Sequence, residues 1–253
     1  MNDYEMKERK RILLTGGPTN EPIDEVMKIT NMSTGSFTTS VAKCFAEKGW
    51  QVTLILNESV YTKDLPKDII IRKVDTTEEM MKALEEESQK EQYHVIIHAA
   101  AVGDYKTDFT FLMEDLAKEI FSKRNGFETW EDVYKLLTDP ECKLDNSSKI
   151  SSYQSDLSVK LCLTPKIIGN LRKWFPQSLL VGCKLLENVP KKELYGVAQA
   201  LCQKNKMDFI LANDLAELRK GVWERYVVTQ DGYTGRELKS PQEVMNFIAE
   251  HII

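Results

Sequence analysis

Short apolar runs alternate with amphipathic segments along the chain, and this alternation limits the possible folds more than any other feature. The apolar runs predict strands at residues 10–15, 51–56, 69–74, 94–101, 179–183, 209–212 and 226–229. Helical spacing lies between them, at residues 36–48, 76–91, 165–174 and 191–204, and again at the C-terminus. Strands that alternate with helices imply an α/β fold with a doubly wound, mostly parallel, Rossmann-like sheet.

The ends of these segments carry signals of their own. Gly49 is a natural stop for the helix at 36–48, and Thr76 or Thr77 can cap the helix at 76–91. The run at 94–101 is almost wholly apolar, which predicts burial on both faces of the sheet. In such a sheet ligands bind outside the carboxyl ends of the strands, so polar residues at those ends are the candidates for a site.

The composition is that of a chain able to bury a full core. Of its 253 residues, 42% are hydrophobic and 29% are charged, and we treat residues 1–253 as a single nucleotide-binding domain. Lys and Arg are spread along the chain and the net charge is -5, so no nucleic-acid partner is expected. The apolar runs are too short to span a bilayer, and residues 1–11 lack the apolar core of a signal peptide, so we expect a cytoplasmic protein without a membrane partner.

The cysteines are scattered and odd in number. There are five, none in a CxxC pair: Cys44, Cys142, Cys162, Cys183 and Cys202. This pattern argues against a structural zinc site or a disulfide framework, and reduced thiols fit best.

One region interrupts the alternation of strands and helices. Residues 106–148 are charged and partly helical, and they contain Pro140 and an Asn125-Gly126 pair. We interpret the region, about 106–152, as an inserted flap beside the ligand crevice. A surface excursion without function is equally compatible with the composition.

The segment from Thr15 to Phe37 (TGGPTNEPIDEVMKITNMSTGSF) departs from an ordinary dinucleotide fold. There a short GxGxxG turn joins strand to helix, whereas here about twenty residues intervene. Gly16 and Gly17 allow a backbone to approach a phosphate closely. Ser33 and Gly35 lie where a helix N-terminus offers N–H groups to an anion. Loops of this length in compact domains are usually functional or disordered, and a plain structural Gly-Gly turn is the alternative.

The end of the fourth strand holds a second polar segment, His98 to Tyr105 (HAAAVGDY). Its small residues let a planar base or a ribose lie on the backbone. Asp104 stands where a carboxylate could hold Mg²⁺ that bridges phosphates. A loop carboxylate that caps a turn is the simpler interpretation of one aspartate.

Three further segments complete the set. Lys149-Ile150-Ser151-Ser152 reaches a triphosphate only if the flap folds back, and is otherwise solvated. Thr164 could cap a helix with Pro165 at its first position, giving another helix start that meets an anion. Ala212-Asn213-Asp214 ends a strand, and Lys204 before it could reach a phosphate or simply occupy a helix C-terminus. A nucleoside-triphosphate pocket explains all five segments.

These segments, in this order, resemble phosphopantothenate–cysteine ligases. The resemblance rests on the motifs TGGPTNEPID, ITNMSTG, HAAAVGDY, KISS, TPKII, VGCKLLENV and FILAND, and runs from about Arg11 to about Asp214. The KISS–TPKII–KLL variant is most similar to the separate ligase of streptococci and enterococci. The resemblance implies activation of 4'-phosphopantothenate by CTP or ATP with Mg²⁺, amide formation with L-cysteine in coenzyme A synthesis, and a homodimer.

The resemblance also implies roles for residues. Asn31 matches the catalytic asparagine, and Lys149, the second implied catalytic residue, matches the first lysine of a KxKK motif that neutralises phosphate charge. Asp104 matches a metal contact. The implied nucleotide-binding set is Gly16, Gly17, Ser33, Thr34, Gly35, Ala100, Ala101, Asp104, Lys149, Pro165, Lys166, Ile167, Ile168, Cys183 and Lys204.

The chain departs from the family pattern at three places. KxKK is reduced to Lys149-Ile150-Ser151-Ser152, so two charges are missing, and Lys184 or Lys166 could supply some of that charge. Cys183 replaces an aromatic residue found in many relatives, and Gly103 replaces a common alanine. The resemblance favours CTP over ATP, and these changes bear on that choice of nucleotide and not on the reaction.

Two other functions use the same fold. The first is an NAD(P)-dependent reductase or epimerase, which would carry a compact GxGxxG, a well-spaced acidic residue for the ribose and usually Tyr-x-x-x-Lys. Here the strand at 51–56 ends at Asn57, and no Tyr is followed four positions later by Lys. The second is a non-catalytic nucleotide-sensing module, against which Asn31, Asp104 and Lys149 together argue.

Overall fold

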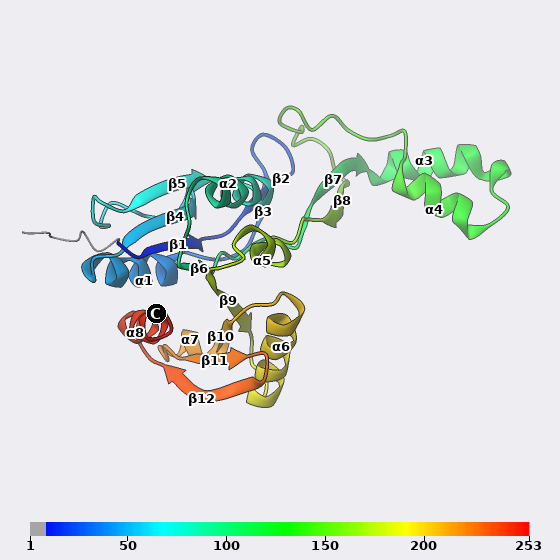
Figure 1. Cartoon of the computed structure of the whole chain (residues 1–253). Helices are drawn as coiled ribbons and strands as arrows, with labels where there is room; N and C mark the ends of the chain where they lie inside the picture. The colour runs from blue at the N-terminus through cyan, green and yellow to red at the C-terminus, as the bar shows by residue number, and fades with distance from the viewer. Residues whose placement is uncertain (1–8, 253) are drawn as a thin grey trace, which may run out of the picture. The chain divides into compact units, whose positions relative to one another are not determined.

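The computed structural model describes residues 9–252, so most of the charged segment 1–11 lies outside the described residues. The chain divides into two compact units (Figure 1). Unit 1 comprises the chain up to Thr19, Met32–Val102 and the chain from Lys166 onward, and unit 2 comprises Asn20–Asn31 and Gly103–Pro165. That both act as one nucleotide-binding domain stays a prediction.

Unit 1 is built on an eight-stranded sheet with the order β12-β11-β10-β9-β6-β1-β4-β5. Its strands are β1 Arg11–Gly16, β4 Gln51–Asn57, β5 Ile70–Val74, β6 Val95–His98, β9 Leu179–Leu186, β10 Phe209–Asp214, β11 Arg225–Thr229 and β12 Gly232–Leu238. The pairings from β5 to β10 are parallel, and only β11 and β12 are added antiparallel. The predicted mostly parallel α/β sheet is confirmed.

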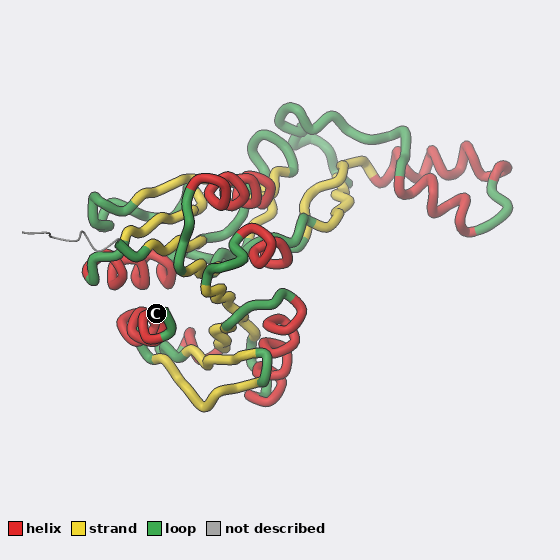
Figure 2. Tube along the Cα trace, viewed as in Figure 1, coloured by secondary structure: helices red, strands yellow, loops and turns green. Residues whose placement is uncertain are grey.

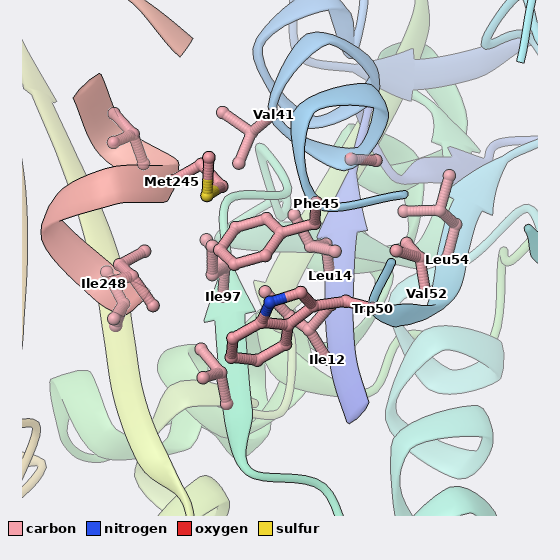
Figure 3. Close-up of a cluster of buried hydrophobic side chains, with 14 of the residues drawn as sticks. Ile12, Leu14, Val41, Phe45, Trp50, Val52, Leu54, Ile97, Met245 and Ile248 are labelled. Carbon is pink, nitrogen blue, oxygen red and sulfur yellow. The ribbon is translucent and has the colours of Figure 1, made fainter. Parts of the chain in front are cut away.

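Helices cover both faces of this sheet. They are α1 Ser36–Glu47, α2 Thr77–Lys90, α5 Leu171–Trp174, α6 Lys191–Lys204, α7 Leu215–Arg219 and α8 Pro241–Glu250. One core cluster packs under α1 and α8, and the other under α2, α5 and α6. Figure 3 shows the first cluster, in which Phe45 meets Trp50 edge to face at 5.0 Å between ring centroids. Two covered faces make the sheet doubly wound.

The predicted helix ends are largely confirmed. Thr76 accepts a hydrogen bond from the backbone N–H of Glu79 and forms a capping box that starts α2. Gly49 follows α1 with a φ of 85°, a left-handed conformation that favours glycine.

The prediction of a helix from Pro165 capped by Thr164 is wrong. A 3₁₀ turn, Ile168–Asn170, comes first, and α5 begins only at Leu171. Thr164 cannot cap a helix because its hydroxyl donates to the Gly103 carbonyl at 2.5 Å. The anion-binding helix start expected at Pro165 is therefore not formed.

The predicted strand at 94–101 is also too long, since β6 ends at His98. Beyond it the backbone keeps only a single bridge between Ala101 and Pro18. Two other strands are longer than predicted: β9 continues to Leu186 and β10 to Asp214.

Unit 2 consists of two antiparallel strand pairs and a helical segment (Figure 2). Its elements are β2 Asn20–Pro22, β3 Lys28–Thr30, β7 Tyr105–Leu112, α3 Met113–Lys123, a 3₁₀ turn Arg124–Gly126, α4 Trp130–Thr138 and β8 Leu157–Leu163. β2 pairs with β3, and β7 pairs with β8. The insertion is longer than the predicted 106–152 because β8 returns to pair with β7.

Within residues 9–252, no helix has both the length and the apolar character needed to cross a membrane.

Candidate functional site

The two ends of the Thr15–Phe37 segment meet beside Val60. Gly17 has a φ of 81° and Gly35 a φ of 71°, so both adopt the left-handed conformation that favours glycine. A Cβ on Gly17 would lie 2.4 Å from Val60 Cγ2, and one on Gly35 would lie 2.8 Å from the same atom and 3.2 Å from the Gly17 nitrogen. The end of β1 and the start of α1 are thus in direct contact, although seventeen residues (18–34) separate these glycines in the chain.

Gly16 has a different reason to be glycine. A Cβ there would lie 2.4 Å from Thr38 Oγ1, and the Thr38 hydroxyl donates to the Thr15 carbonyl at 3.0 Å. Helix α1 therefore packs directly on the last turn of β1. This supports the structural interpretation for Gly16, while Gly17 and Gly35 shape the loop itself.

The N-terminus of α1 lacks an internal partner for its first N–H groups. Gly35 is the N-cap and forms no side-chain cap, and the first turn has no acidic residue. The first intrahelical bond joins the Thr39 N–H to the Gly35 carbonyl at 3.1 Å, which leaves the N–H groups of Phe37 and Thr38 without an intrahelical acceptor. Such a terminus suits an anion.

Hydrogen bonds from Lys73 hold the loop that carries Val60. The Lys73 ammonium donates to the carbonyls of Asn57 at 3.2 Å, Glu58 at 3.3 Å and Val60 at 2.7 Å. Burial lowers the pKa of Lys73. Asn57, itself fully buried, accepts the Ser59 N–H at 2.9 Å. Lys73 and Asn57 therefore fix the position of Val60 against the two glycines.

The end of β6 lies beside the same glycines. The Ala101 N–H donates to the Gly17 carbonyl at 2.8 Å, and the Ala100 N–H donates to the Thr15 hydroxyl at 3.3 Å. That hydroxyl is also 2.8 Å from His98 Nδ1. Ala100 and Ala101 thus join Gly16, Gly17 and Gly35 at the carboxyl edge of the sheet.

Burial lowers the pKa of His98 to about 4. The unfolded chain binds a proton near pH 6.5 and the folded chain only near pH 4, so stability should fall as the pH drops through this window. We expect the loss to reach about 3 kcal/mol at the lower end. Urea unfolding at a series of pH values measures the free energy of unfolding. This free energy should fall with decreasing pH in the native chain and fall less steeply in His98→Gln. His251→Gln, at an exposed histidine, is the control. An equal slope in His98→Gln would show that another group is responsible.

In unit 2, Asp24 holds the segment that carries Lys149. Its carboxylate accepts the N–H groups of Ile150 at 2.9 Å, Val26 at 2.8 Å and Met27 at 2.7 Å. The Ile150 N–H is the largest cause that lowers the pKa of Asp24. Lys149, the residue before Ile150, is exposed. Asn31, just after β3, is also exposed.

Asp104 is exposed in unit 2. Among the described residues, no group of three or more His, Cys, Asp or Glu side chains could hold a metal ion. A resident metal is therefore not supported by a donor set. A single carboxylate does fit Mg²⁺ that arrives with phosphates, because this ion keeps waters and binds one or two carboxylates plus substrate oxygens.

The remaining predicted nucleotide contacts are scattered. Ile167 is 2% exposed and belongs to the core under α2, so its side chain is not open to a ligand, and Ile168 packs against the same core. Lys166 is exposed. Cys183 lies in β9, and burial raises the pKa of its thiol to about 12.

Lys204 is not brought to the glycine cluster. It is the last residue of α6, which runs back from the carboxyl end of β9 to the start of β10. It therefore lies toward the amino edge of the parallel strands, at a helix C-terminus that favours a cation, which was the simpler of its two interpretations.

The structure thus divides the predicted site residues into two sets. Unit 1 brings together Gly16, Gly17, Gly35, Ala100 and Ala101, with Ser33 and Thr34 directly before Gly35. Unit 2 contains Asn31, Asp104, Lys149 and Pro165. Sequence reasoning missed Val60, Lys73 and Asp24, whose importance comes from contacts with residues distant in the chain.

The fold and the glycine cluster define a Rossmann-like α/β protein with an extended first loop. Residues 7–118 match the family described as DNA/pantothenate metabolism flavoprotein C-terminal domain. The chain is 30% identical over 208 residues to the coenzyme A biosynthesis bifunctional protein CoaBC of Thermococcus kodakarensis, and 28% identical over 227 residues to that of Methanocaldococcus jannaschii. These alignments cover 82% and 88% of this chain but 42% and 46% of the relatives, so the chain spans less than half of their length.

Solved structures agree. The DNA/pantothenate metabolism flavoprotein from Streptococcus pneumoniae has a TM-score of 0.76 at 26% identity, over 96% of this chain and 98% of that one. A Cab2 mutant in complex with phosphopantothenate-cysteine shares the fold, with a TM-score of 0.68 at 16% identity over 98% of this chain and 88% of that one. This chain is therefore similar in sequence to part of the CoaBC proteins, and residues 7–118 match the flavoprotein C-terminal domain model.

Proposed function

We propose that this protein is a phosphopantothenate–cysteine ligase driven by a nucleoside triphosphate. The observation that carries the proposal is the contact of Gly17 and Gly35 around Val60, which sets an uncapped helix N-terminus beside the end of β1. That arrangement suits phosphates. The homology to coenzyme A biosynthesis proteins, and the neighbour whose structure holds phosphopantothenate-cysteine, support this substrate class.

The proposed reaction has two steps. The carboxylate of 4'-phosphopantothenate attacks the α-phosphorus of the nucleotide, which forms an acyl-nucleotidylate and releases pyrophosphate. The amine of L-cysteine then attacks the acyl carbon, which forms the amide and releases the nucleoside monophosphate and a proton. Neither step needs an enzyme nucleophile, so catalysis rests on positioning and on neutralising charge.

In this proposal the residues of the chain have the following roles. The N–H groups at the start of α1, with Ser33 and Thr34, bind phosphate oxygens. Lys149 neutralises phosphate charge from a segment that Asp24 holds in place. The Asn31 amide donates a hydrogen bond to the acyl-nucleotidylate. Asp104 would hold Mg²⁺ that accompanies the nucleotide and lowers its charge.

The nucleotide and the oligomeric state of the proposed ligase follow from the resemblance. CTP is favoured by the resemblance, whereas Cys183 stands where many relatives carry an aromatic residue. A homodimer is expected on the same grounds. The choice of CTP and the homodimer are therefore parts of the proposal.

A pyrophosphate-release assay tests the function. Purified protein with phosphopantothenate, cysteine and Mg²⁺ should release pyrophosphate with CTP, and a parallel reaction with ATP ranks the two nucleotides. Omitting phosphopantothenate should abolish the signal, which controls for simple nucleotide hydrolysis. No pyrophosphate with either nucleotide would end the ligase assignment.

A further inference from the structure

Arg225 is a buried cation at the carboxyl edge of the sheet. It is 6% exposed and is the first residue of β11. Because β11 runs antiparallel to β10, with Tyr226 opposite Ala212, its first residue lies at the end where the parallel strands finish. This is the edge at which the glycine cluster and the start of α1 lie.

Two aromatic rings hold the guanidinium in place. Its central carbon is 4.6 Å from the centroid of the Trp223 ring and 5.1 Å from that of Phe37. Phe37 is the second residue of α1, and the two rings stack at 5.9 Å. Arg225 is therefore fixed next to the first turn of α1, where N–H groups lack intrahelical acceptors.

Arg225 has no acidic partner to explain its burial. Its one side-chain hydrogen bond goes from Nη1 to the carbonyl of neighbouring Glu224, at 2.9 Å, and it forms no ion pair with any described residue. Burial lowers the pKa of Arg225, and it raises the pKa of the neighbouring Cys183 thiol to about 12, so this thiol supplies no negative charge at neutral pH. A buried charge is normally paired, because desolvation of an unpaired ion is costly.

The unused donors of Arg225 remain open. A guanidinium has five N–H donors in a rigid fork, and the single bond to Glu224 uses one. Within residues 9–252, the Nε and Nη2 atoms of Arg225 form no hydrogen bond, since the one side-chain bond comes from Nη1. A cation held rigidly, with free donors, beside a helix N-terminus is suited to an anion that both would contact.

We propose that Arg225 and the N-terminus of α1 form one anion-binding site, which takes a phosphate group of the nucleoside triphosphate. The identity of the ligand rests on the proposed function, whereas the anion site itself rests on Arg225.

Calorimetric titration with two probes, tripolyphosphate and CTP, tests this site. Arg225→Met should weaken binding of both probes by about tenfold to a hundredfold, the usual effect of losing a charge-assisted contact. Arg225→Lys, which keeps the charge but not the fork, should lie between that variant and the native chain. Arg236→Met, at an exposed arginine of β12, is the matched control and should bind like the native chain.

The outcomes distinguish failure of the Arg225 anion site from failure of the proposed ligase function. If tripolyphosphate binding depends on Arg225 but CTP does not bind, the anion site stands and the proposal that this ligase uses CTP fails. If the native chain binds either probe and Arg225→Met binds it equally well, Arg225 is only a packing residue and the inference is overturned. Binding of neither probe to the native chain overturns the anion site and the use of CTP. Thermal unfolding without ligand, measured on each variant, shows whether a loss of affinity comes from loss of folded protein.

Discussion

Replacing Asn31 with alanine should lower formation of the amide product by about a hundredfold to a thousandfold, while pyrophosphate release from a single turnover persists. This is the range seen when one hydrogen-bond donor to a reacting group is removed. The acyl-nucleotidylate should accumulate, because the first step does not use the Asn31 amide in the proposed mechanism. Rapid quenching and mass spectrometry measure the intermediate and the product directly.

The control for this experiment is Asn246→Ala. Asn246 is exposed on α8 and its amide oxygen accepts a hydrogen bond from the Gln242 side chain of the same helix, so its loss should change neither step. Asn31 is exposed and contributes to no core cluster. Asn31→Ala should therefore change the free energy of unfolding by no more than about a few tenths of a kcal/mol. Normal turnover in Asn31→Ala would remove Asn31 from the mechanism.

Replacing Gly17 with alanine should both destabilise the chain and weaken nucleotide binding by more than about tenfold. The left-handed backbone at Gly17 costs a non-glycine residue about 1–2 kcal/mol. The new Cβ would also lie 2.4 Å from Val60 Cγ2, and overpacking of this kind costs about 1–3 kcal/mol. Val60 must then move, and the contact that joins Gly17 to Gly35 opens.

Gly49→Ala separates the two costs of the Gly17 substitution. Gly49 has a φ of 85°, close to the 81° of Gly17, but a Cβ there would meet no atom within 4 Å. Denaturant unfolding of Gly49→Ala therefore measures backbone strain alone. Adding Val60→Ala to Gly17→Ala should recover the steric part of the loss. A Gly17→Ala variant no less stable than Gly49→Ala would contradict the close contact with Val60.

The framework of the fold could be predicted from local sequence. The strand–helix alternation, the bounds of α6 and the cap of α2 all follow from periodicity and from end signals within one segment. Pairings between distant segments could not be predicted. The β2–β3 hairpin has strands of only three residues, and β7 finds β8 across the whole helical segment.

The candidate site was predicted where its chemistry is local and missed where it depends on tertiary contacts. Gly17 and Gly35 are visible as glycines at strand and helix ends. Nothing in the sequence distinguishes Arg225 from a surface arginine, because its burial comes from Phe37, nearly two hundred residues earlier. Thr164 precedes a proline, as a helix cap often does, yet its hydroxyl donates a hydrogen bond to the carbonyl of Gly103, which is distant in the sequence.

The most direct test of the ligase account follows one oxygen atom. Phosphopantothenate labelled with ¹⁸O in its carboxylate is converted with cysteine, Mg²⁺ and the better of CTP and ATP, and the nucleotide products are analysed by mass spectrometry. The account predicts one ¹⁸O atom in the nucleoside monophosphate and none in pyrophosphate, because the carboxylate attacks the α-phosphorus. Label in inorganic phosphate together with a nucleoside diphosphate, or no transfer of label at all, would contradict it.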